Sequence, residues 1–131
     1  MIVYVESSAA VKLFGLEPEA DALVGYLDEL AGDAATTLVS SAILETEVRR
    51  AAVRAELAQS RATAILDRFE IVDLDRSVYT AAGVLPGRQL RSLDALHIAA
   101  AFKVDAEVML SYDTRQIAAA QAAGLRTLSP A

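Results

Sequence analysis

Hydrophobic residues recur along this chain at two spacings, one typical of buried strands and one typical of helices. Short apolar runs rich in β-branched residues predict strands, and they lie at residues 1–5, 36–40, 70–74, 107–112 and 125–128. Between them, helical spacing predicts helices over residues 9–16, 18–31, 42–58, 62–69, 75–85, 92–103 and 113–123. Strands that alternate with helices in this way predict an α/β fold with a mostly parallel sheet covered on both faces.

Turn and cap residues mark where several of these elements begin and end. Pro18 suits the first turn of its helix, because proline lacks the N–H that would go unpaired there. Asp75, Ser92 and Asp113 each stand where an apolar helical segment opens, so we expect them to act as N-caps. Gly124 is expected at the C-terminal stop of the last helix.

The composition is that of a compact globular protein. Hydrophobic residues make up 54% of the 131 residues and charged residues 23%, which predicts a single domain over residues 1–131. The chain has no cysteine and one histidine. These counts exclude disulfides and thiolate metal sites, and they argue against a histidine-rich zinc site. Any metal is therefore expected to be a hard cation held by carboxylate oxygens, namely Mg²⁺, Mn²⁺ or Ca²⁺.

The sequence carries no signal for a membrane. No apolar run approaches the roughly 20 residues that span a bilayer, and the first residues lack the basic region and cleavage site of a signal peptide. We therefore expect a cytoplasmic protein.

The formal net charge of −6 argues against a protein that coats nucleic acid by charge alone, since such affinity comes from Lys and Arg on phosphates. It does not exclude a nuclease, because acids that bind cations add to the negative count. The arginines gather at two places, with Arg49, Arg50 and Arg54 on one predicted helix and Arg88 and Arg91 just before another.

The segment from Leu90 to Ala101 is an almost entirely apolar helix with one acid, Asp94, near its start. With Ser92 as N-cap, Asp94 lies in the first turn, where unpaired N–H groups and the helix dipole favour a carboxylate. Complementing the dipole is one explanation for this acid. The other is that this buried helix holds the Asp94 carboxylate where it can bind a cation or a substrate.

Two further acids follow predicted strands, at the sheet edge where sites of parallel α/β proteins form. Glu6 comes directly after the first strand and Asp113 after the fourth. Each has a structural alternative. Glu6 could be a solvated turn residue, and Asp113 could be an N-cap with Gln116 completing a capping box.

The long helix over residues 42–58 carries Glu45 and Glu47, which point about 200° apart around the axis. Glu47 shares the apolar stripe of its helix, whereas Glu45 pairs with Arg49 at i+4 on the surface. An acid on a buried face is costly unless it is paired or binds a metal. A salt bridge from Glu47 to Arg50 or Arg54 is the structural alternative.

Taken together, these carboxylates from separate elements favour metal-assisted phosphodiester hydrolysis, in which a hard cation generates the nucleophile without a histidine base. The expected catalytic and metal-binding residues are Glu6, Glu47, Asp94 and Asp113. Ser8, two residues past Glu6, is expected to support the site by hydrogen bonding to a ligand carboxylate. His97 is expected to be a core or supporting residue rather than a direct catalyst.

Four segments carry these acids: Val3–Leu13, Glu47–Ala51, Leu90–Ala101 and Ser111–Arg115. In order and spacing they resemble the motifs of the PIN-domain family, specifically the VapC-type toxin ribonucleases of type II toxin–antitoxin pairs. The resemblance spans essentially the whole chain, and the third segment, with Ser92-Leu93-Asp94-Ala95-Leu96-His97, is the most specific.

The resemblance implies a three-layer α/β/α sandwich and an endoribonuclease that depends on Mg²⁺ or Mn²⁺. It also implies a homodimer, held inactive by a small VapB-type antitoxin. The acidic cluster carried over is Glu6, Glu47, Asp94 and Asp113, with Ser8 as support. One departure from the family pattern is Glu6, where Asp is usual. Its extra methylene moves the carboxylate outward and could slow catalysis.

Two other functions fit parts of the pattern. The first is a PIN-fold binding module, weakened catalytically by Glu6, that acts by forming a complex with an antitoxin. The second is a phosphoacceptor signalling domain, which shares the α/β pattern and an acidic Mg²⁺ pocket. That class has adjacent acids after the first strand and a lysine after the last, where this chain has the single Glu6 and Arg126.

Overall fold

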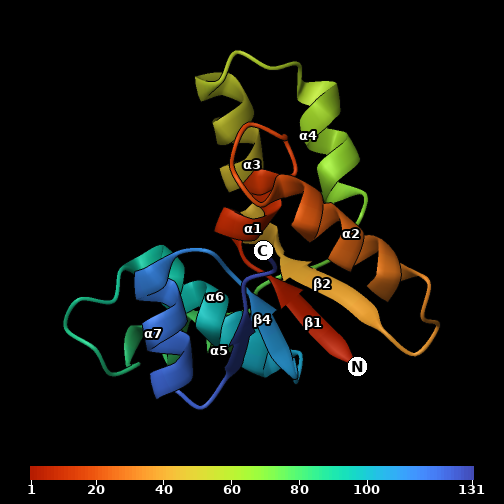
Figure 1. Ribbon diagram of the computed structural model, residues 1–131. Helices are drawn as coiled ribbons and strands as arrows, with labels where there is room; N and C mark the ends of the chain where they lie inside the picture. The colour runs from red at the N-terminus through yellow and green to blue at the C-terminus, as the bar shows by residue number, and fades with distance from the viewer.

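The fold is a three-layer α/β/α sandwich around a five-stranded parallel sheet (Figure 1), as predicted. The computed structural model describes residues 1–131. The strands are β1 (Ile2–Val5), β2 (Thr37–Ser41), β3 (Glu70–Val72), β4 (Val108–Leu110) and β5 (Arg126–Leu128). The helices are α1 (Ser7–Lys12), α2 (Ala20–Ala31), α3 (Ala42–Arg54), α4 (Gln59–Leu66), α5 (Arg76–Gly83), α6 (Ser92–Lys103) and α7 (Thr114–Ala122).

The strand order is β3-β2-β1-β4-β5, so the first strand lies at the centre. Val3 of β1 pairs with Leu38 of β2 on one side and with Val108 of β4 on the other. The chain therefore winds outward in both directions from β1. Such a switch point is where parallel α/β sheets open a crevice beyond the carboxyl ends of their strands.

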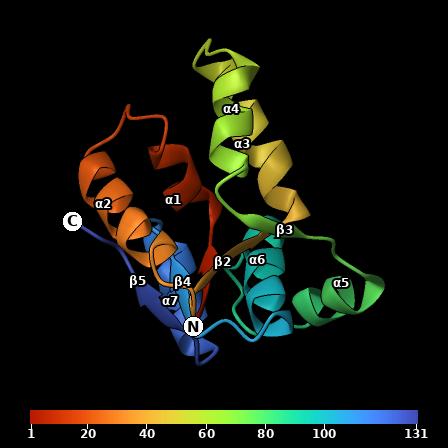
Figure 2. The ribbon, with the colours of Figure 1, turned by 90° about the vertical axis from the view of Figure 1, so that its right-hand side faces the viewer.

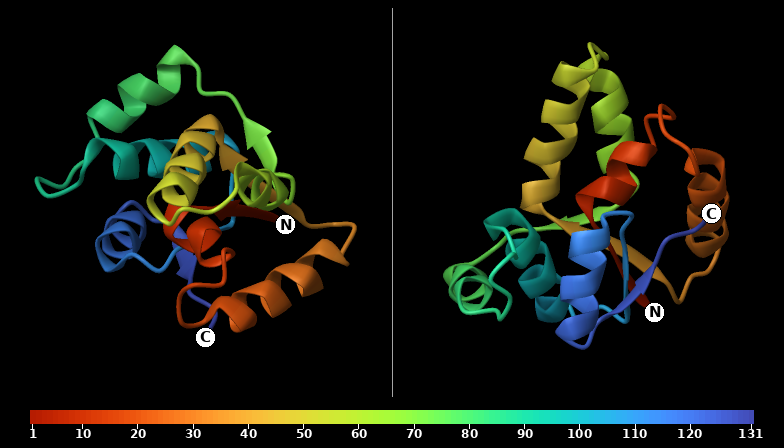
Figure 3. Two further views of the ribbon diagram at one scale, coloured as in Figure 1. Left: turned by 90° about the horizontal axis from the view of Figure 1, so that it is seen from above. Right: turned by 60° about the vertical axis from the view of Figure 1, so that its left-hand side comes forward.

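Alternating residues of β1 point into two separate cores, because side chains of a strand alternate between faces. Val3 and Val5 pack in a cluster with helices α1 to α4. Tyr4 packs on the opposite face with α5, α6 and α7. Figure 2 shows α1 and α2 on one side of the strands and α5 and α6 on the other, and the right-hand view of Figure 3 shows α7 next to α5 and α6. In Figure 1, α3 and α4 project from the end of the sheet toward which β1 and β2 point.

The predicted elements are all present, but several boundaries differ. Pro18 does not open α2, because the N-cap is Glu19, in the left-handed conformation. The prediction that Ser92 is an N-cap was also wrong, since Arg91 takes that position and makes no side-chain capping bond. Asp75 and Asp113 do cap their helices, and Gly124, with φ of 94°, follows α7 as expected. None of the helices combines the length and apolarity needed to cross a bilayer.

Helix α3 ends at Arg54 rather than continuing to residue 58, because Glu56 adopts a left-handed conformation with φ of 56°. The N–H of Glu56 donates to the Val53 carbonyl (3.2 Å) and that of Leu57 to the Ala52 carbonyl (2.9 Å). These two bonds form a Schellman motif, which usually has glycine at the left-handed position. The chain turns back there, and α4 packs against α3.

Replacing Glu56 with glycine should stabilise the fold, because glycine adopts this conformation without a Cβ clash. We expect Glu56→Gly to raise the free energy of unfolding by about 0.5–1 kcal/mol in urea denaturation. Glu56→Ala, which removes the carboxylate but keeps the Cβ, is the matched control. An equal gain in the alanine variant would show that charge, rather than backbone conformation, limits stability there.

Candidate active site

The four predicted acids line one open cleft of about 660 Å³ beyond the carboxyl ends of β1 and β4. Glu6 follows β1, Glu47 lies on α3, Asp94 begins α6 and Asp113 follows β4. The cleft wall also includes Ser8, Lys12, Thr46, Arg50, Arg54, Leu93 and Tyr112. Residues that are more than a hundred positions apart in the chain are thus brought together by the central position of β1.

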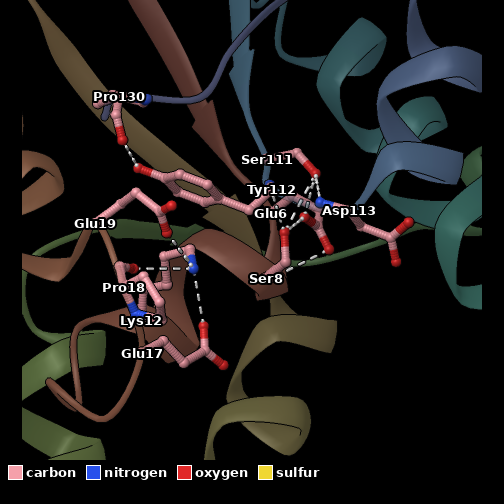
Figure 4. A network of polar contacts seen from close by, with 10 residues as sticks. All are labelled: Glu6, Ser8, Lys12, Glu17, Pro18, Glu19, Ser111, Tyr112, Asp113 and Pro130. Atoms are coloured by element: carbon pink, nitrogen blue, oxygen red, sulfur yellow. Dashed lines mark hydrogen bonds and ion pairs between the residues drawn. The ribbon is translucent and has the colours of Figure 1, made fainter.

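Glu6 is almost fully buried, with 3% of its surface exposed, so it is not a solvated turn residue. Its Oε1 accepts hydrogen bonds from Ser7 Oγ (2.8 Å) and the Ser8 backbone N–H (3.1 Å). Its Oε2 accepts from Ser8 Oγ (2.5 Å) and Ser111 Oγ (2.7 Å). The bond to the Ser8 amide also caps α1. Glu6 therefore holds the start of α1 and the end of β4 together (Figure 4).

The expected hydrogen bond from Ser8 to a cleft carboxylate is present, and Ser8 does more than this. Its Oγ also accepts from the backbone N–H of Tyr112 (2.8 Å) and lies 3.2 Å from Ser111 Oγ. Ser111, which sequence reasoning missed as a contact of Glu6, is fully buried and accepts from the Asp113 N–H (3.2 Å). The signal that could have identified Ser111 is its place between a strand and the acid Asp113.

Glu47 contacts neither Arg50 nor Arg54, so the salt-bridge alternative for this acid was wrong. Its partner is His97 on α6, whose Nε2 lies 2.6 Å from Glu47 Oε1. The predicted surface pair from Glu45 to Arg49 is present, at 3.7 Å. His97 itself is completely buried, which agrees with a core or supporting role.

Asp94 is the one acid of the cleft whose carboxylate has no hydrogen-bond partner within the protein. Burial raises the pKa of Asp94, and the nearby carboxylates of Asp113 and Glu6 raise it further. Its position in the first turn of α6 offers some compensation through the helix dipole. The dipole alone does not account for an acid placed among other acids, so this carboxylate would gain from a cation.

Asp113 is the exposed N-cap of α7, and its Oδ1 accepts from the N–H groups of Arg115 (2.9 Å) and Gln116 (3.2 Å). The capping box with Gln116, which belonged to the structural alternative for this acid, is absent. Gln116 is instead fully buried, and its Nε2 donates to the Asp94 backbone carbonyl (3.2 Å). The Gln116 side chain thus ties the start of α7 to the start of α6, which places Asp113 beside Asp94.

The donor chemistry of the cleft fits a hard divalent cation, because all of its acidic ligands are carboxylate oxygens. No three of the His, Asp and Glu side chains are already gathered as a complete set of metal ligands. In this arrangement Glu6, Glu47 and Asp113 each hydrogen-bond to protein groups. Asp94, without such a partner and with a raised pKa, is the carboxylate most available to a cation.

The basic residues of the cleft divide into two kinds. Lys12 is buried and its ammonium is fully used, since it donates to Glu17 (3.1 Å), the Pro18 carbonyl (3.1 Å) and Glu19 (3.2 Å). It also lies 4.4 Å from the centre of the Tyr112 ring (Figure 4). The side chains of Arg50 and Arg54 make no ion pair or hydrogen bond within the chain.

A sequence model of the PIN domain matches residues 3–122, which is most of the chain. The chain belongs to the PIN domain family. Among curated proteins it is 37% identical to ribonuclease VapC46 of Mycobacterium tuberculosis, covering 98% of this chain and 97% of that protein. It is also 37% identical to ribonuclease VapC35 of the same species, with the same coverage.

Solved PIN-fold structures superpose on nearly the whole chain. VapBC2 of Rickettsia felis, bound to a DNA fragment from its promoter, gives a TM-score of 0.75 at 20% identity and covers 98% of both chains. M. tuberculosis VapC20, described as a toxin that cleaves the sarcin–ricin loop, gives 0.73 at 14% identity, covering 98% of this chain and 99% of that one. The fold is therefore retained where little sequence is shared.

Removing the charge of Asp94 should stabilise the folded protein at neutral pH. The pKa of Asp94 is raised in the folded state above its ordinary value of 3.8. Ionising Asp94 therefore lowers the free energy of unfolding as the pH rises above 3.8. We expect Asp94→Asn to unfold at a higher urea concentration than the parent at pH 7. The two curves should converge as pH falls toward 3.8. A variant less stable than the parent at pH 7 would contradict the cost of ionising Asp94, which arises first from its burial and then from the carboxylates of Asp113 and Glu6.

Proposed function

We propose that this protein is a metal-dependent endoribonuclease that acts as the toxin of a toxin–antitoxin system and hydrolyses RNA phosphodiester bonds in the cytoplasm. The observation that carries the proposal is the convergence of four carboxylates from separate elements on one cleft. The full-length similarity to VapC ribonucleases supports the same activity.

In this proposal, Asp94, Glu47, Asp113 and Glu6 hold one or more Mg²⁺ or Mn²⁺ ions. When bound, such a cation polarises the phosphate and lowers the pKa of a coordinated water molecule, which supplies the nucleophile at neutral pH. The contribution of the protein is to fix the carboxylates. Ser8 and Ser111 orient Glu6 through their hydroxyl groups, and the N-terminus of α7 orients Asp113.

The unpaired arginines of the cleft are suited to bind the RNA backbone. Arg50 and Arg54 are one helical turn apart on α3, so they lie on the same side of that helix. Guanidinium groups bind phosphate through paired N–H donors. Since Lys12 is already saturated by protein acceptors, these two arginines are the cations of the cleft that remain available to a polyanion.

The proposed protein partners are a VapB-type antitoxin and a second copy of this chain. Solved structures of similar fold include the VapBC2 complex of R. felis and the VapBC-1 complex of nontypeable Haemophilus influenzae. Large apolar side chains remain exposed on this chain, including Tyr79 (54%), Val84 (79%) and Leu93 (51%). Tyr79 and Leu93 line one mostly apolar pocket, and contiguous apolar surface is typical of sites covered by another protein chain.

The first test is cleavage of total cellular RNA by the purified protein with Mg²⁺, Mn²⁺ or a chelator. We expect discrete cleavage products in the presence of metal and none in chelator. Asp94→Asn should lower the cleavage rate by about 100-fold or more, because interactions with the reacting phosphate and its cation contribute several kcal/mol. Mapping the ends of the products would identify the preferred RNA.

Asp67→Asn is the matched control, since Asp67 is an exposed acid at the end of α4, away from the cleft. This variant should cleave as the parent does. Cleavage by Asp94→Asn at the parent's rate would contradict the proposed site. An inactive parent together with an active Glu6→Asp variant would instead mean that Glu6 prevents catalysis in the parent protein.

Replacing Arg50 and Arg54 with alanine should weaken RNA binding without disturbing the fold, because neither side chain has a partner within the chain. RNA binding to an inactive Asp94→Asn protein is measured as a function of salt concentration. Each lost phosphate contact should reduce the slope of log K against log salt by roughly 0.7. Arg76→Ala, on α5 and outside the cleft, is the control. An unchanged slope in the double variant would place the RNA path elsewhere.

A further inference from the structure

A chain of buried polar side chains runs through the core of the molecule and ends at Glu47. Tyr4 of β1 and His97 of α6 are both completely buried. The Tyr4 hydroxyl lies 2.7 Å from His97 Nδ1 and 3.0 Å from Oγ of Ser41, which is also completely buried. The other ring nitrogen, His97 Nε2, lies 2.6 Å from Glu47 Oε1. Four elements of the fold therefore meet along one line of hydrogen bonds.

The arrangement leaves the His97 ring little freedom to turn. Both ring nitrogens are held by partners on opposite sides. The Tyr4 and His97 rings also meet edge to face, with centroids 5.7 Å apart and an interplanar angle of 71°. Because Ser41 holds the Tyr4 hydroxyl in turn, the position of the imidazole is determined by groups deep in the core.

The core does not require these hydrogen-bonded polar side chains for its stability. Burying hydroxyl and imidazole groups costs free energy that their hydrogen bonds only recover, whereas apolar side chains of the same size would pack without that cost. The neighbours of His97 on α6 are apolar and buried, among them Ile98 and Ala101. Among these hydrogen-bonded side chains, only that of Glu47 reaches solvent, and it is 21% exposed in the cleft.

We infer that Tyr4 and His97 are positioning residues for Glu47, an inference that rests on the proposed nuclease function. His97 engages only Oε1 of Glu47, so Oε2 remains without a partner in the protein. A carboxylate held by one oxygen presents the other in a fixed direction, which favours binding of a cation or its water. Tyr4 acts on Glu47 indirectly, because it holds the imidazole of His97 in place.

The experiment measures Mn²⁺ binding to the full chain by isothermal titration calorimetry, without RNA. His97→Leu should weaken Mn²⁺ binding by about 10- to 100-fold, the usual effect of removing a group that orients a metal ligand. Tyr4→Phe, which removes a single oxygen, should weaken it by about 2- to 10-fold. His97→Gln should restore part of the affinity, because its amide is also a donor.

Ile98→Val is the control for a general loss of packing, since Ile98 is buried beside His97 on the same helix. It should lower the stability of the fold slightly, because a buried methyl group is lost, and leave Mn²⁺ affinity unchanged. In RNA cleavage, the positioning variants should lower kcat more than they change KM. Parent-like Mn²⁺ affinity in Tyr4→Phe and in any folded His97→Leu protein would overturn the inference.

A second readout separates this inference from the proposed function. The ¹⁵N signal of His97 Nε2 is followed by NMR in the metal-free parent and in Glu47→Gln. We expect the signal to shift when the carboxylate becomes an amide, and an unchanged signal would overturn the positioning role. If the signal shifts but the parent neither binds Mn²⁺ nor cleaves RNA, the contact stands while the nuclease function fails.

Discussion

Mutual repulsion among carboxylates is the constraint on which the cleft depends. Four acids share one open cleft, and three of them are held there by hydrogen bonds from the protein. Glu6 binds hydroxyl groups, Glu47 binds an imidazole, and Asp113 binds the first amides of α7. Asp94 alone lacks such a partner, and its pKa is raised first by burial and then by repulsion from the carboxylates of Asp113 and Glu6. A cation would relieve that repulsion, which is the physical basis for the proposed metal site.

The supports of this cleft reach far into the core. Ser111 and His97 are completely buried, and each connects a cleft acid to a different part of the sheet. Polar groups at such depth are costly unless every hydrogen bond is made. The hydroxyl of Ser111 and both ring nitrogens of His97 are paired, so their hydrogen bonds offset the cost of burying them. Gln116 Oε1 is the one buried side-chain polar atom without a partner.

The basic groups of the cleft show a similar division between structure and function. Lys12 ties the segment with Glu17 and Glu19 to the end of α1. It also lies over the ring of Tyr112, whose hydroxyl donates to the Pro130 carbonyl at 2.5 Å. Figure 4 shows this group beside the cluster around Glu6. Because Lys12 is committed to these contacts, the cleft keeps its unpaired positive charge on α3 alone. An acidic protein thereby retains a local surface that suits a polyanion.

The sequence alone determined the fold class and the positions of the acids. Alternating strand and helix patterns predicted the parallel sheet, and helical geometry separated Glu47 from the surface residue Glu45, because such periodicities depend only on neighbours along the chain. Tertiary structure decided which partners the acids take. Ser111 contacts Glu6, and His97, itself held by Tyr4, contacts Glu47. These contacts join elements that are distant in the sequence, so no local pattern encodes them. The predicted start of α2 and the predicted end of α3 were also wrong. Glu19 and Glu56 adopt left-handed conformations there, which glutamate does not favour.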